Sequence, residues 1–393
     1  MSSGSHIQAM QDALRRQAVP GWLFYGFQQI DPLALRILGF REDAHISRRW
    51  FYLVPDRGEP RKLVHRIEAF QLDHLPGSQR VYLKWSELKS ELARLLSRHD
   101  RVAMQYSPEC GIPYVSRIDA GTVELVRSTG VEVIPSADLI QLFESVLTAR
   151  QAEQHRETAR ALTEIVNDTF QGTAEKIRSG QSLLEHEVQQ SILTALEDRG
   201  LVWDHAPIVA VNAHSGNPHY SPPAEGSGRI SIGDFLLIDL WARPPAGVYA
   251  DITWTAFLGP TVPDPIEQAF DIARRARDRG VEFLDETLAS GREVEGWQVD
   301  DQVRAVIEEA GFGSFFVHRT GHNIGRDVHG SGVNFDNIET HDTRKVIPGV
   351  LCSVEPGIYL EDFGVRTEIN VLAGHQGVEV TTPPQERIVT FAL

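Results

Sequence analysis

Cysteine is scarce in this chain: the 393 residues include only Cys110 and Cys352. Two cysteines so far apart exclude a disulfide framework and a cysteine-based zinc site, and they favour a reducing, cytoplasmic compartment. Long apolar runs are also missing, because no stretch approaches roughly 18 uninterrupted apolar residues, so we expect no transmembrane helix. Residues 1–11 are polar and contain no apolar core of a signal peptide, so we expect no secretory signal.

Positive charge is in deficit. Lys and Arg together number 38 against 54 for Asp and Glu, which gives a formal net charge of −16. Such a chain repels a phosphate backbone and an anionic membrane surface, so we expect neither nucleic acid nor a membrane as a partner. Hydrophobic residues make up 41% of the sequence, which is enough for a packed core, and the length suits two domains.

The first part of the chain alternates short apolar runs with helical patterns. Residues 50–54 and 101–104 are typical of strands, and residues 85–98 are typical of an amphipathic helix. No glycine-rich phosphate-binding loop occurs among them. The pattern predicts an N-terminal α/β domain over residues 1–145.

The sequence becomes strongly helical over residues 138–178, and we expect the two domains to join there. The remainder, residues 146–393, has the pattern of an α+β domain. Residues 234–242 and 248–258 are apolar and rich in β-branched side chains, and a segment with two prolines and a glycine separates them. This arrangement predicts a β-hairpin.

Two acids stand in segments that are otherwise apolar. Asp239 interrupts the run 235–241, and Asp251 interrupts the run 248–257. A carboxylate in a buried strand costs several kcal/mol unless it is paired or binds a metal. The predicted hairpin would make the two acids cross-strand neighbours. One of them could instead pair with an arginine or cap a turn, but two such acids on one hairpin favour a cation site.

Two further acids have similar surroundings. Glu355 ends the apolar run 350–354, and Glu368 lies within residues 365–372, which predict a single strand. Taken alone, Glu355 could be a solvated strand end, and Glu368 could form an edge-strand salt bridge with Arg366. Four acids in strands, beside a loop rich in histidine, are difficult to reconcile with a core that lacks a metal.

The histidine-rich loop contains His318, His322 and His329. The pair Thr320-Gly321 favours a loop over a helix, and a loop can bring a ring close to a ligand. For the histidines alone, a solvated surface loop is the simpler interpretation. Together with the acids, however, the charges of four carboxylates balance two divalent cations. Mostly oxygen ligands with one imidazole favour Mn²⁺, Co²⁺ or Zn²⁺.

The ordered set of acids and histidine resembles the five-ligand signature of the pita-bread metallopeptidases, in the branch of Xaa-Pro dipeptidases (prolidases) and aminopeptidase P. The strings that carry the resemblance are Leu237-Ile238-Asp239-Leu240, Ala250-Asp251-Ile252-Thr253, Thr320-Gly321-His322-Asn323-Ile324-Gly325, Val354-Glu355-Pro356-Gly357-Ile358-Tyr359 and Gly364-Val365-Arg366-Thr367-Glu368. The resemblance implies a pita-bread (creatinase/aminopeptidase-like) catalytic domain over residues 146–393. It also implies a smaller N-terminal α/β domain of the creatinase/prolidase type over residues 1–145.

The resemblance implies hydrolysis of Xaa-Pro bonds by a hydroxide that bridges two divalent metal ions. We expect Mn²⁺, with Co²⁺ and Zn²⁺ as alternatives. Asp239 would chelate one ion, His322 and Glu355 would chelate the other, and Asp251 and Glu368 would bridge them. Glu355 would also carry the proton to the leaving prolyl nitrogen.

Further roles follow from the same resemblance. His219 would contact the substrate, His318 and His329 would line the pocket and stabilise the tetrahedral intermediate, and Arg366 would orient the last ligand or the substrate. Thr253 would support the metal site from outside the ligand set. A homodimer is the family's usual assembly, and we expect one here.

The chain also departs from the family's pattern. The two strand aspartates are twelve residues apart, one more than is usual. Asn323 stands where a glycine usually follows the ligand histidine, and Gly330 stands where an acid usually follows the distal histidine. His341 and Arg344 are both candidates for gripping the substrate carboxylate, and the sequence does not choose between them.

Three functions agree with these observations to different degrees. Hydrolysis of Xaa-Pro dipeptides is our main prediction, because no insertion is long enough to build an extended peptide groove. Aminopeptidase P, which removes the residue before proline from longer peptides, is the alternative enzyme, and the relative rates on Ala-Pro and Ala-Pro-Ala separate the two. A non-catalytic pita-bread binding module is the alternative of another class, and it would purify without stoichiometric metal.

Overall fold

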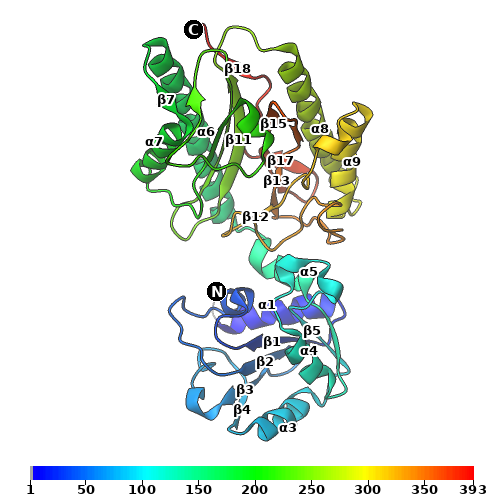
Figure 1. Ribbon diagram of the computed structural model, residues 1–393. Helices are drawn as coiled ribbons and strands as arrows, with labels where there is room; N and C mark the ends of the chain where they lie inside the picture. Colours follow the sequence, from blue (N-terminus) through cyan, green and yellow to red (C-terminus); the bar gives the residue numbers. More distant parts are fainter. Residues whose placement is uncertain (1–2) are drawn as a thin grey trace. The chain divides into compact units, whose positions relative to one another are not determined.

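The computed structural model describes residues 3–393, which form two compact units (Figure 1). One unit extends to Glu144 and the other begins at Ser145. A five-residue π-helical stretch, Gln141–Ser145, contains the boundary between the units, and the long helix α6, Ala149–Arg178, begins four residues after it. Thr148 caps α6, because its hydroxyl accepts a hydrogen bond from the Gln151 amide while the Gln151 side chain accepts one from the Thr148 amide.

The N-terminal unit is a mixed sheet with helices on both faces. Its strands follow the order β4-β3-β2-β1-β5-β6. The strands are β1 (Gly21–Gly26), β2 (Trp50–Pro55), β3 (Arg61–His65), β4 (Ser78–Tyr82), β5 (Arg101–Met104) and β6 (Glu132–Pro135). The helices are α1 (Ser3–Arg16), α2 (Pro32–Ile37), α3 (Trp85–Leu96), α4 (Ala120–Arg127) and α5 (Ala137–Ile140).

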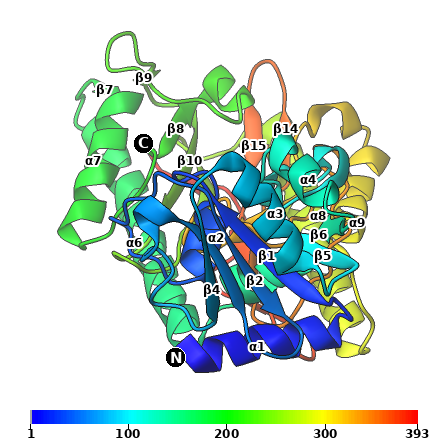
Figure 2. The ribbon, with the colours of Figure 1, turned by 90° about the horizontal axis from the view of Figure 1, so that it is seen from below.

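The side chains of β1 point alternately into the two hydrophobic cores of this unit. Trp22 and Phe24 pack with residues of α1 and α2, whereas Leu23 and Tyr25 pack with residues of α3 and α4. Successive side chains of a strand point to opposite faces, so one buried strand supplies both layers. Figure 2 shows α1 and α3 with the strands of this sheet from a second direction.

The C-terminal unit contains the predicted hairpin and all of the predicted site residues. Its helices are α6, α7 (Glu185–Asp198), α8 (Asp264–Ala289) and α9 (Gly296–Glu309). Its strands are β7 (Leu183–Leu184), β8 (Ile208–Val211), β9 (Arg229–Ile230), β10 (Phe235–Ala242), β11 (Ala250–Phe257), β12 (Asn323–Ile324), β13 (Leu351–Val354), β14 (Gly357–Tyr359), β15 (Gly364–Arg366), β16 (Ile369–Ala373), β17 (Val378–Val380) and β18 (Val389–Thr390).

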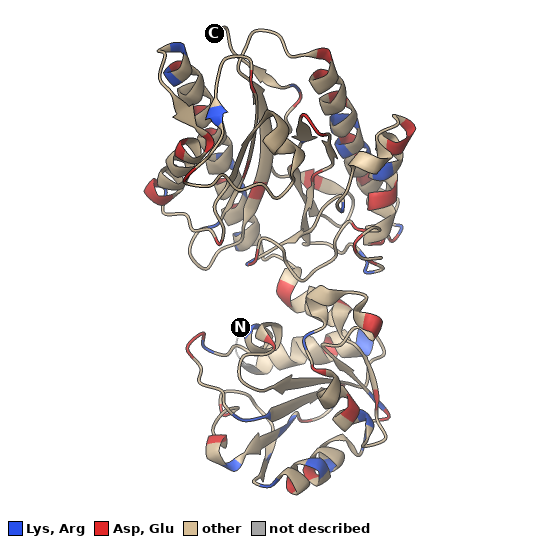
Figure 3. Cartoon of the chain, in the orientation of Figure 1, with Lys and Arg blue, Asp and Glu red and all other residues tan. Residues whose placement is uncertain are grey.

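The strands pair in sheets of order β18-β11-β10-β8 and β12-β13-β16-β17, with the shorter pairs β14-β15 and β7-β9. Apolar residues of α6 and α7 pack against one face of β10 and β11, and residues of α8 and α9 pack with Phe235 and Leu237 of β10 on the other side. Figure 1 shows this layer of strands between the two helical pairs. Charged residues of both signs lie along α8 and α9, and acidic positions also occur among the strands (Figure 3).

One predicted element is wrong in its extent. Residues 365–372 do not form one strand, because β15 ends at Arg366 and β16 begins at Ile369. β15 pairs with β14, whereas β16 pairs with β13 and β17, so the chain changes partner at this point. The break contains Glu368, and the buried guanidinium of Arg277 fixes it by donating to the Thr367 hydroxyl at 2.9 Å.

None of the helices within residues 3–393 is long and apolar enough to cross a membrane.

A buried histidine of α6 gives the C-terminal unit a pH-dependent stability. His155 is fully buried, with Nδ1 2.9 Å from the Tyr249 carbonyl oxygen and Nε2 2.7 Å from the Thr381 hydroxyl. Burial lowers the pKa of His155 to about 4, although the hydrogen bond to Tyr249 partly opposes this shift. The folded state therefore binds fewer protons than the unfolded state between about pH 6.5 and pH 4, and its stability falls as the pH falls through that window.

We expect His155→Gln to remove this dependence. Between pH 7 and pH 5, the free energy of unfolding of the natural chain should fall by about 2 kcal/mol more than that of the variant. Urea denaturation at both pH values, with chelator present so that metal binding does not contribute, measures the difference. Equal pH slopes for the two proteins would contradict the prediction.

Candidate metal centre

The hairpin β10-β11 places the first two predicted ligands on one face of the sheet. Asp239 lies opposite Thr253, and Asp251 lies opposite Trp241, so the two acids are cross-strand neighbours on the diagonal, on the same face of the hairpin. Pairing is continuous from Phe235 to Ala242 of β10, and the connection between the strands therefore accommodates the additional residue.

The other predicted ligands lie on adjacent segments of the second sheet. The His322 amide donates to the Ser353 hydroxyl at 2.9 Å, and the Ser353 amide donates to the His322 carbonyl oxygen at 2.9 Å. The Glu355 amide donates to the Thr320 carbonyl oxygen at 2.7 Å. Gly321 permits this close approach, because a Cβ there would lie 2.0 Å from the Ser353 carbonyl oxygen.

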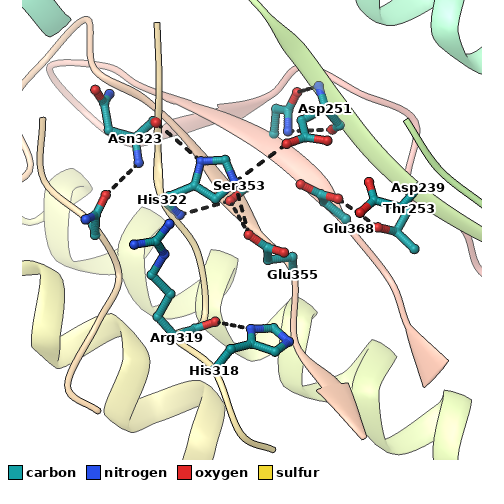
Figure 4. A network of polar contacts seen from close by, with 12 residues as sticks. Asp239, Asp251, Thr253, His318, Arg319, His322, Asn323, Ser353, Glu355 and Glu368 are labelled. Carbon is teal, nitrogen blue, oxygen red and sulfur yellow. Dashed lines mark hydrogen bonds and ion pairs between the residues drawn. The ribbon is translucent and has the colours of Figure 1, made fainter. Parts of the chain in front are cut away.

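All five predicted ligands converge (Figure 4). Asp251, His322 and Glu368 each offer a ligand atom, and these atoms lie within 4.8 Å of one another. His322 Nε2 is 3.2 Å from Glu355 Oε1 and 3.6 Å from Asp251 Oδ2. Asp239 is close to the same group, because its charge helps to raise the pKa of both Asp251 and Glu368, and Thr253 beside it donates to Glu368 Oε2 at 2.8 Å. The site is buried, with exposed fractions of 4% for Asp251 and 2% for Glu368.

The carboxylates of this cluster are incompletely satisfied. Among the described residues, Asp239 Oδ1, Asp251 Oδ1 and Glu368 Oε1 are buried and have no hydrogen-bond partner. Burial, together with the charges of the neighbouring acids, raises the pKa of all three groups, most strongly for Asp251 and Glu368. Buried carboxylate oxygens without partners, in a cluster that also contains an imidazole nitrogen, are the donor set that a divalent cation requires. The residues present therefore fit a metal centre.

Glu355 has the opposite electrostatic character. Burial alone would raise its pKa, but the hydrogen bond with His322 and the neighbouring His318 and Arg366 hold the pKa of Glu355 well below its usual range. The Ser353 hydroxyl donates to Glu355 Oε1 at 2.9 Å. This acid therefore stays ionised beside three carboxyl groups that favour a proton.

Arg366 supplies the buried positive charge next to the cluster. Its Nη2 donates to Asp239 Oδ2 at 2.5 Å, its Nε donates to the Thr253 hydroxyl at 3.0 Å, and its Nη1 donates to the Tyr359 hydroxyl at 2.9 Å. Tyr359 in turn lies 2.7 Å from His318 Nε2. Burial lowers the pKa of His318 to about 4, so its ring is neutral at pH 7.

Two other predicted histidines lie at the edge of the cluster. The ring of His329 contacts that of His322 edge to face, with centroids 4.4 Å apart, and the charge of His322 lowers the pKa of His329 to about 3. His219 is exposed, and its amide donates to Asn217 Oδ1 at 3.1 Å. The carbonyl of Pro218 links that segment to the cluster through a 3.5 Å contact with Arg366 Nη1.

The two candidates for gripping a substrate carboxylate have other partners. Arg344 is buried and forms a forked pair with Asp342, at 2.9 Å and 2.6 Å, while its Nη1 donates to the Ser331 carbonyl oxygen. His341 is exposed, packs against the ring of Trp297 and lies 2.7 Å from Asn337 Oδ1. The structure gives neither residue a contact with the acid cluster.

The sequence did not point to Glu185, a further buried carboxylate that lies near the segment of His219. Glu185, at the start of α7, accepts hydrogen bonds from the Val211 and Gly228 amides, both at 2.8 Å, and from the Tyr220 hydroxyl at 2.7 Å. It also contacts His214 Nδ1 at 2.9 Å, and the rings of His214 and Tyr220 stack. Tyr220 follows His219 directly, but Glu185 resembles an ordinary helix-start acid, and no spacing connects the two in the sequence.

Residues 153–375, more than half of the chain, match the metallopeptidase family M24. The chain belongs to this family. The match includes all five predicted ligands, and M24 peptidases are metal-dependent, as the predicted cluster requires. The family and the pita-bread fold predicted from the sequence are thereby confirmed.

Some M24 relatives match about half of the chain in sequence, and some solved structures match its whole length in fold. It is 31% identical over 209 residues to the probable dipeptidase PepE of Mycobacterium tuberculosis, and the match covers 52% of each protein. The chain thus spans about half the length of the curated relatives it matches. The crystal structure of dipeptidase PepE from Mycobacterium ulcerans superposes with a TM-score of 0.73 at 22% identity, covering 100% of this chain and 98% of that one. A prolidase structure from Thermococcus sibiricus has a TM-score of 0.68 at 19% identity, covering both chains fully.

Proposed function

We propose that this protein is a dinuclear-metal peptidase that hydrolyses Xaa-Pro bonds, with dipeptides as its substrates. The observation that carries the proposal is the convergence of Asp251, His322 and Glu368, whose ligand atoms lie within 4.8 Å of one another, beside buried oxygens of Asp239, Asp251 and Glu368 that have no partner among the described residues. Arg366 offsets only one of these negative charges. With Glu355 counted, three negative charges remain, and two divalent cations together with one hydroxide would neutralise them. The cations would also lower the pKa of a shared water and polarise the scissile carbonyl.

The ligand roles follow the order of the residues around the cluster. In the proposal, Asp239 binds one cation, and His322 with Glu355 binds the other. Asp251 and Glu368 would each contribute to holding both cations, which suits their raised pKa values in the absence of a cation. Mn²⁺ is the proposed ion, because four carboxylates and one imidazole form an oxygen-rich set, and Co²⁺ and Zn²⁺ are the alternatives.

The chain's own residues handle the proton and the substrate. Glu355, the acid that stays ionised, accepts a proton from the attacking water. It then passes this proton to the prolyl nitrogen as the Xaa-Pro bond breaks. His318 and His329 stand beside the cluster as neutral rings and stabilise the reacting carbonyl, and His219 contacts the substrate from the neighbouring segment. Arg366 orients Asp239 through its 2.5 Å contact.

Metal quantification of the purified protein, combined with an Xaa-Pro hydrolysis assay, tests the proposal. We expect two equivalents of metal per chain and hydrolysis of Ala-Pro that chelator abolishes and Mn²⁺, Co²⁺ or Zn²⁺ restores. Faster cleavage of Ala-Pro-Ala than of Ala-Pro would replace the dipeptidase by an aminopeptidase. A protein that purifies without stoichiometric metal and leaves both peptides intact would be a binding module.

We expect His329→Ala to lower kcat by about tenfold or more while the metal content stays near normal, because the ring contacts His322 but belongs to no ligand pair. Steady-state kinetics on Ala-Pro and metal analysis measure both quantities. His375→Ala, which removes an exposed histidine from the loop between β16 and β17, is the control. Loss of metal from the His329 variant would make this residue a ligand and its proposed role wrong.

A further inference from the structure

Asn323 directly follows the predicted ligand His322 and is fully buried. Its side chain both accepts and donates: Oδ1 accepts from the Gly332 amide at 2.8 Å, and Nδ2 donates to the Leu351 carbonyl oxygen at 2.9 Å. Its backbone carbonyl accepts from the Gly330 amide at 2.7 Å. One residue therefore ties the segment around residues 330–332 to strand β13.

Gly330 and Gly332 leave the space that the Asn323 side chain occupies. A Cβ on Gly330 would lie 2.2 Å from Asn323 Oδ1, and a Cβ on Gly332 would lie 2.7 Å from Asn323 Cγ. Any larger residue at either position would need the space that the amide occupies. We call Asn323, Gly330 and Gly332 the amide clamp. Both departures from the family's pattern at positions 323 and 330 are parts of this one arrangement.

The amide clamp closes a loop, residues 325–332, whose other end is also fixed. The Tyr249 amide donates to the Gly325 carbonyl oxygen at 2.9 Å, and Val328 packs into a small apolar cluster with Tyr249 and Leu351. His329 is the next residue, and its ring rests against that of His322. With both ends held, the loop has little freedom to move this ring away from the cluster.

We propose that Asn323 is a positioning residue that holds His329 against the metal centre by means of the amide clamp. This inference rests on the proposed peptidase function for its kinetic consequences, but the clamp itself is a property of the loop. Both a donor and an acceptor are needed, because Gly332 presents an N–H and Leu351 presents a carbonyl oxygen, and each is buried with its partner.

A double-mutant cycle on Ala-Pro hydrolysis tests whether Asn323 acts through His329. We expect Asn323→Gly to lower kcat by about tenfold in the natural chain but by less than about twofold in a His329→Ala background. Asn323→Asp, which keeps the acceptor and loses the donor, should also lower kcat. Gln11→Ala is the matched control, because it removes a buried amide that donates to the Pro55 and Gly58 carbonyls in the N-terminal unit. Effects that multiply independently would overturn the inference.

Hydrogen–deuterium exchange provides a readout that does not depend on activity. In Asn323→Gly loaded with Mn²⁺, amides of residues 325–332 should exchange at least about tenfold faster, while those of β10 stay unchanged. Unchanged exchange in the loop would overturn the inference. The two proposals can fail separately. If the natural chain binds two metals but cleaves no peptide, the proposed function is wrong. The amide clamp still holds in that case if exchange is faster in the Asn323→Gly variant.

A second variant covers the case in which Asn323→Gly does not fold. Gly330→Ala places a methyl group against Asn323 Oδ1 and should likewise accelerate exchange in residues 325–332. Combining it with Asn323→Ala, which frees that space, should cause no greater acceleration than Asn323→Ala alone. A combined variant whose exchange is the product of two separate effects would contradict the matched packing of the amide clamp.

Discussion

Glu368→Ala is expected to abolish peptide hydrolysis and to reduce the bound metal to one equivalent or none. Glu368 is buried, its Oε2 accepts from Thr253, and its Oε1 has no partner among the described residues. It also lies within 4.8 Å, ligand atom to ligand atom, of Asp251 and His322. Removing this carboxylate leaves one unit of positive charge uncompensated and takes away a donor proposed to serve both cations, so at least one of them should dissociate. Asp251→Ala should behave in the same way.

Metal analysis and kinetics on Ala-Pro measure both effects in one preparation. Glu68→Ala in the N-terminal unit is the matched control, because it removes another buried glutamate, one that accepts hydrogen bonds from the Ser47 and Arg48 amides. That control should lose stability but keep its metal and its turnover. Retained activity with two equivalents of metal in Glu368→Ala would reject the bridging role.

Arg366→Met is expected to lower kcat/KM by about a hundredfold to a thousandfold, the range seen when a preorganised charge is removed from an active site. The guanidinium joins Asp239, Thr253 and Tyr359 in one buried network. Its loss leaves Asp239 without its ionic partner and Tyr359 without its donor, so both the proposed ligand and the contact to His318 lose their orientation.

Arg366→Lys separates charge from shape. A lysine retains the positive charge but cannot reproduce three donors in a fixed fork, so we expect it to recover only part of the lost activity. Arg36→Lys is the control, because Arg36 makes an ion pair with Glu144, at 2.7 Å, in the N-terminal unit. Activity of the Arg366→Met variant within twofold of the natural chain would show that this network does not support the reaction.

Much of the site was predictable because buried charge is so uncommon. Asp239 and Asp251 stand out as acids between apolar neighbours, and such acids need a partner wherever the strands lie. The offset between them was not predictable, because strand register depends on the geometry of the connection, which the alternation of side chains does not specify.

Long-range pairing also explains what the sequence did not reveal. Residues 365–372 read as one strand because β-branched residues recur at every second position from Val365 to Val371, yet the two ends of this segment pair with different sheets. Tyr359 and Glu185 carry no local signal of their importance, since each depends on partners that are distant in the chain. The role of Asn323 likewise appears only when Gly330 and Gly332 are seen beside its amide.

The backbone bonds that join the His322 segment to β13 have a consequence for ion choice. His322 exchanges hydrogen bonds with the hydroxyl and the amide of Ser353, and the Glu355 amide donates to the Thr320 carbonyl oxygen, so the cage that His322 and Glu355 would help to form has little room to widen. Calcium needs six to eight oxygens at about 2.3–2.6 Å, in an adaptable shell. If the proposed metal centre forms, a stiff enclosure of four acids and one ring would discriminate by ionic radius, and we expect it to bind calcium poorly even where that ion is abundant.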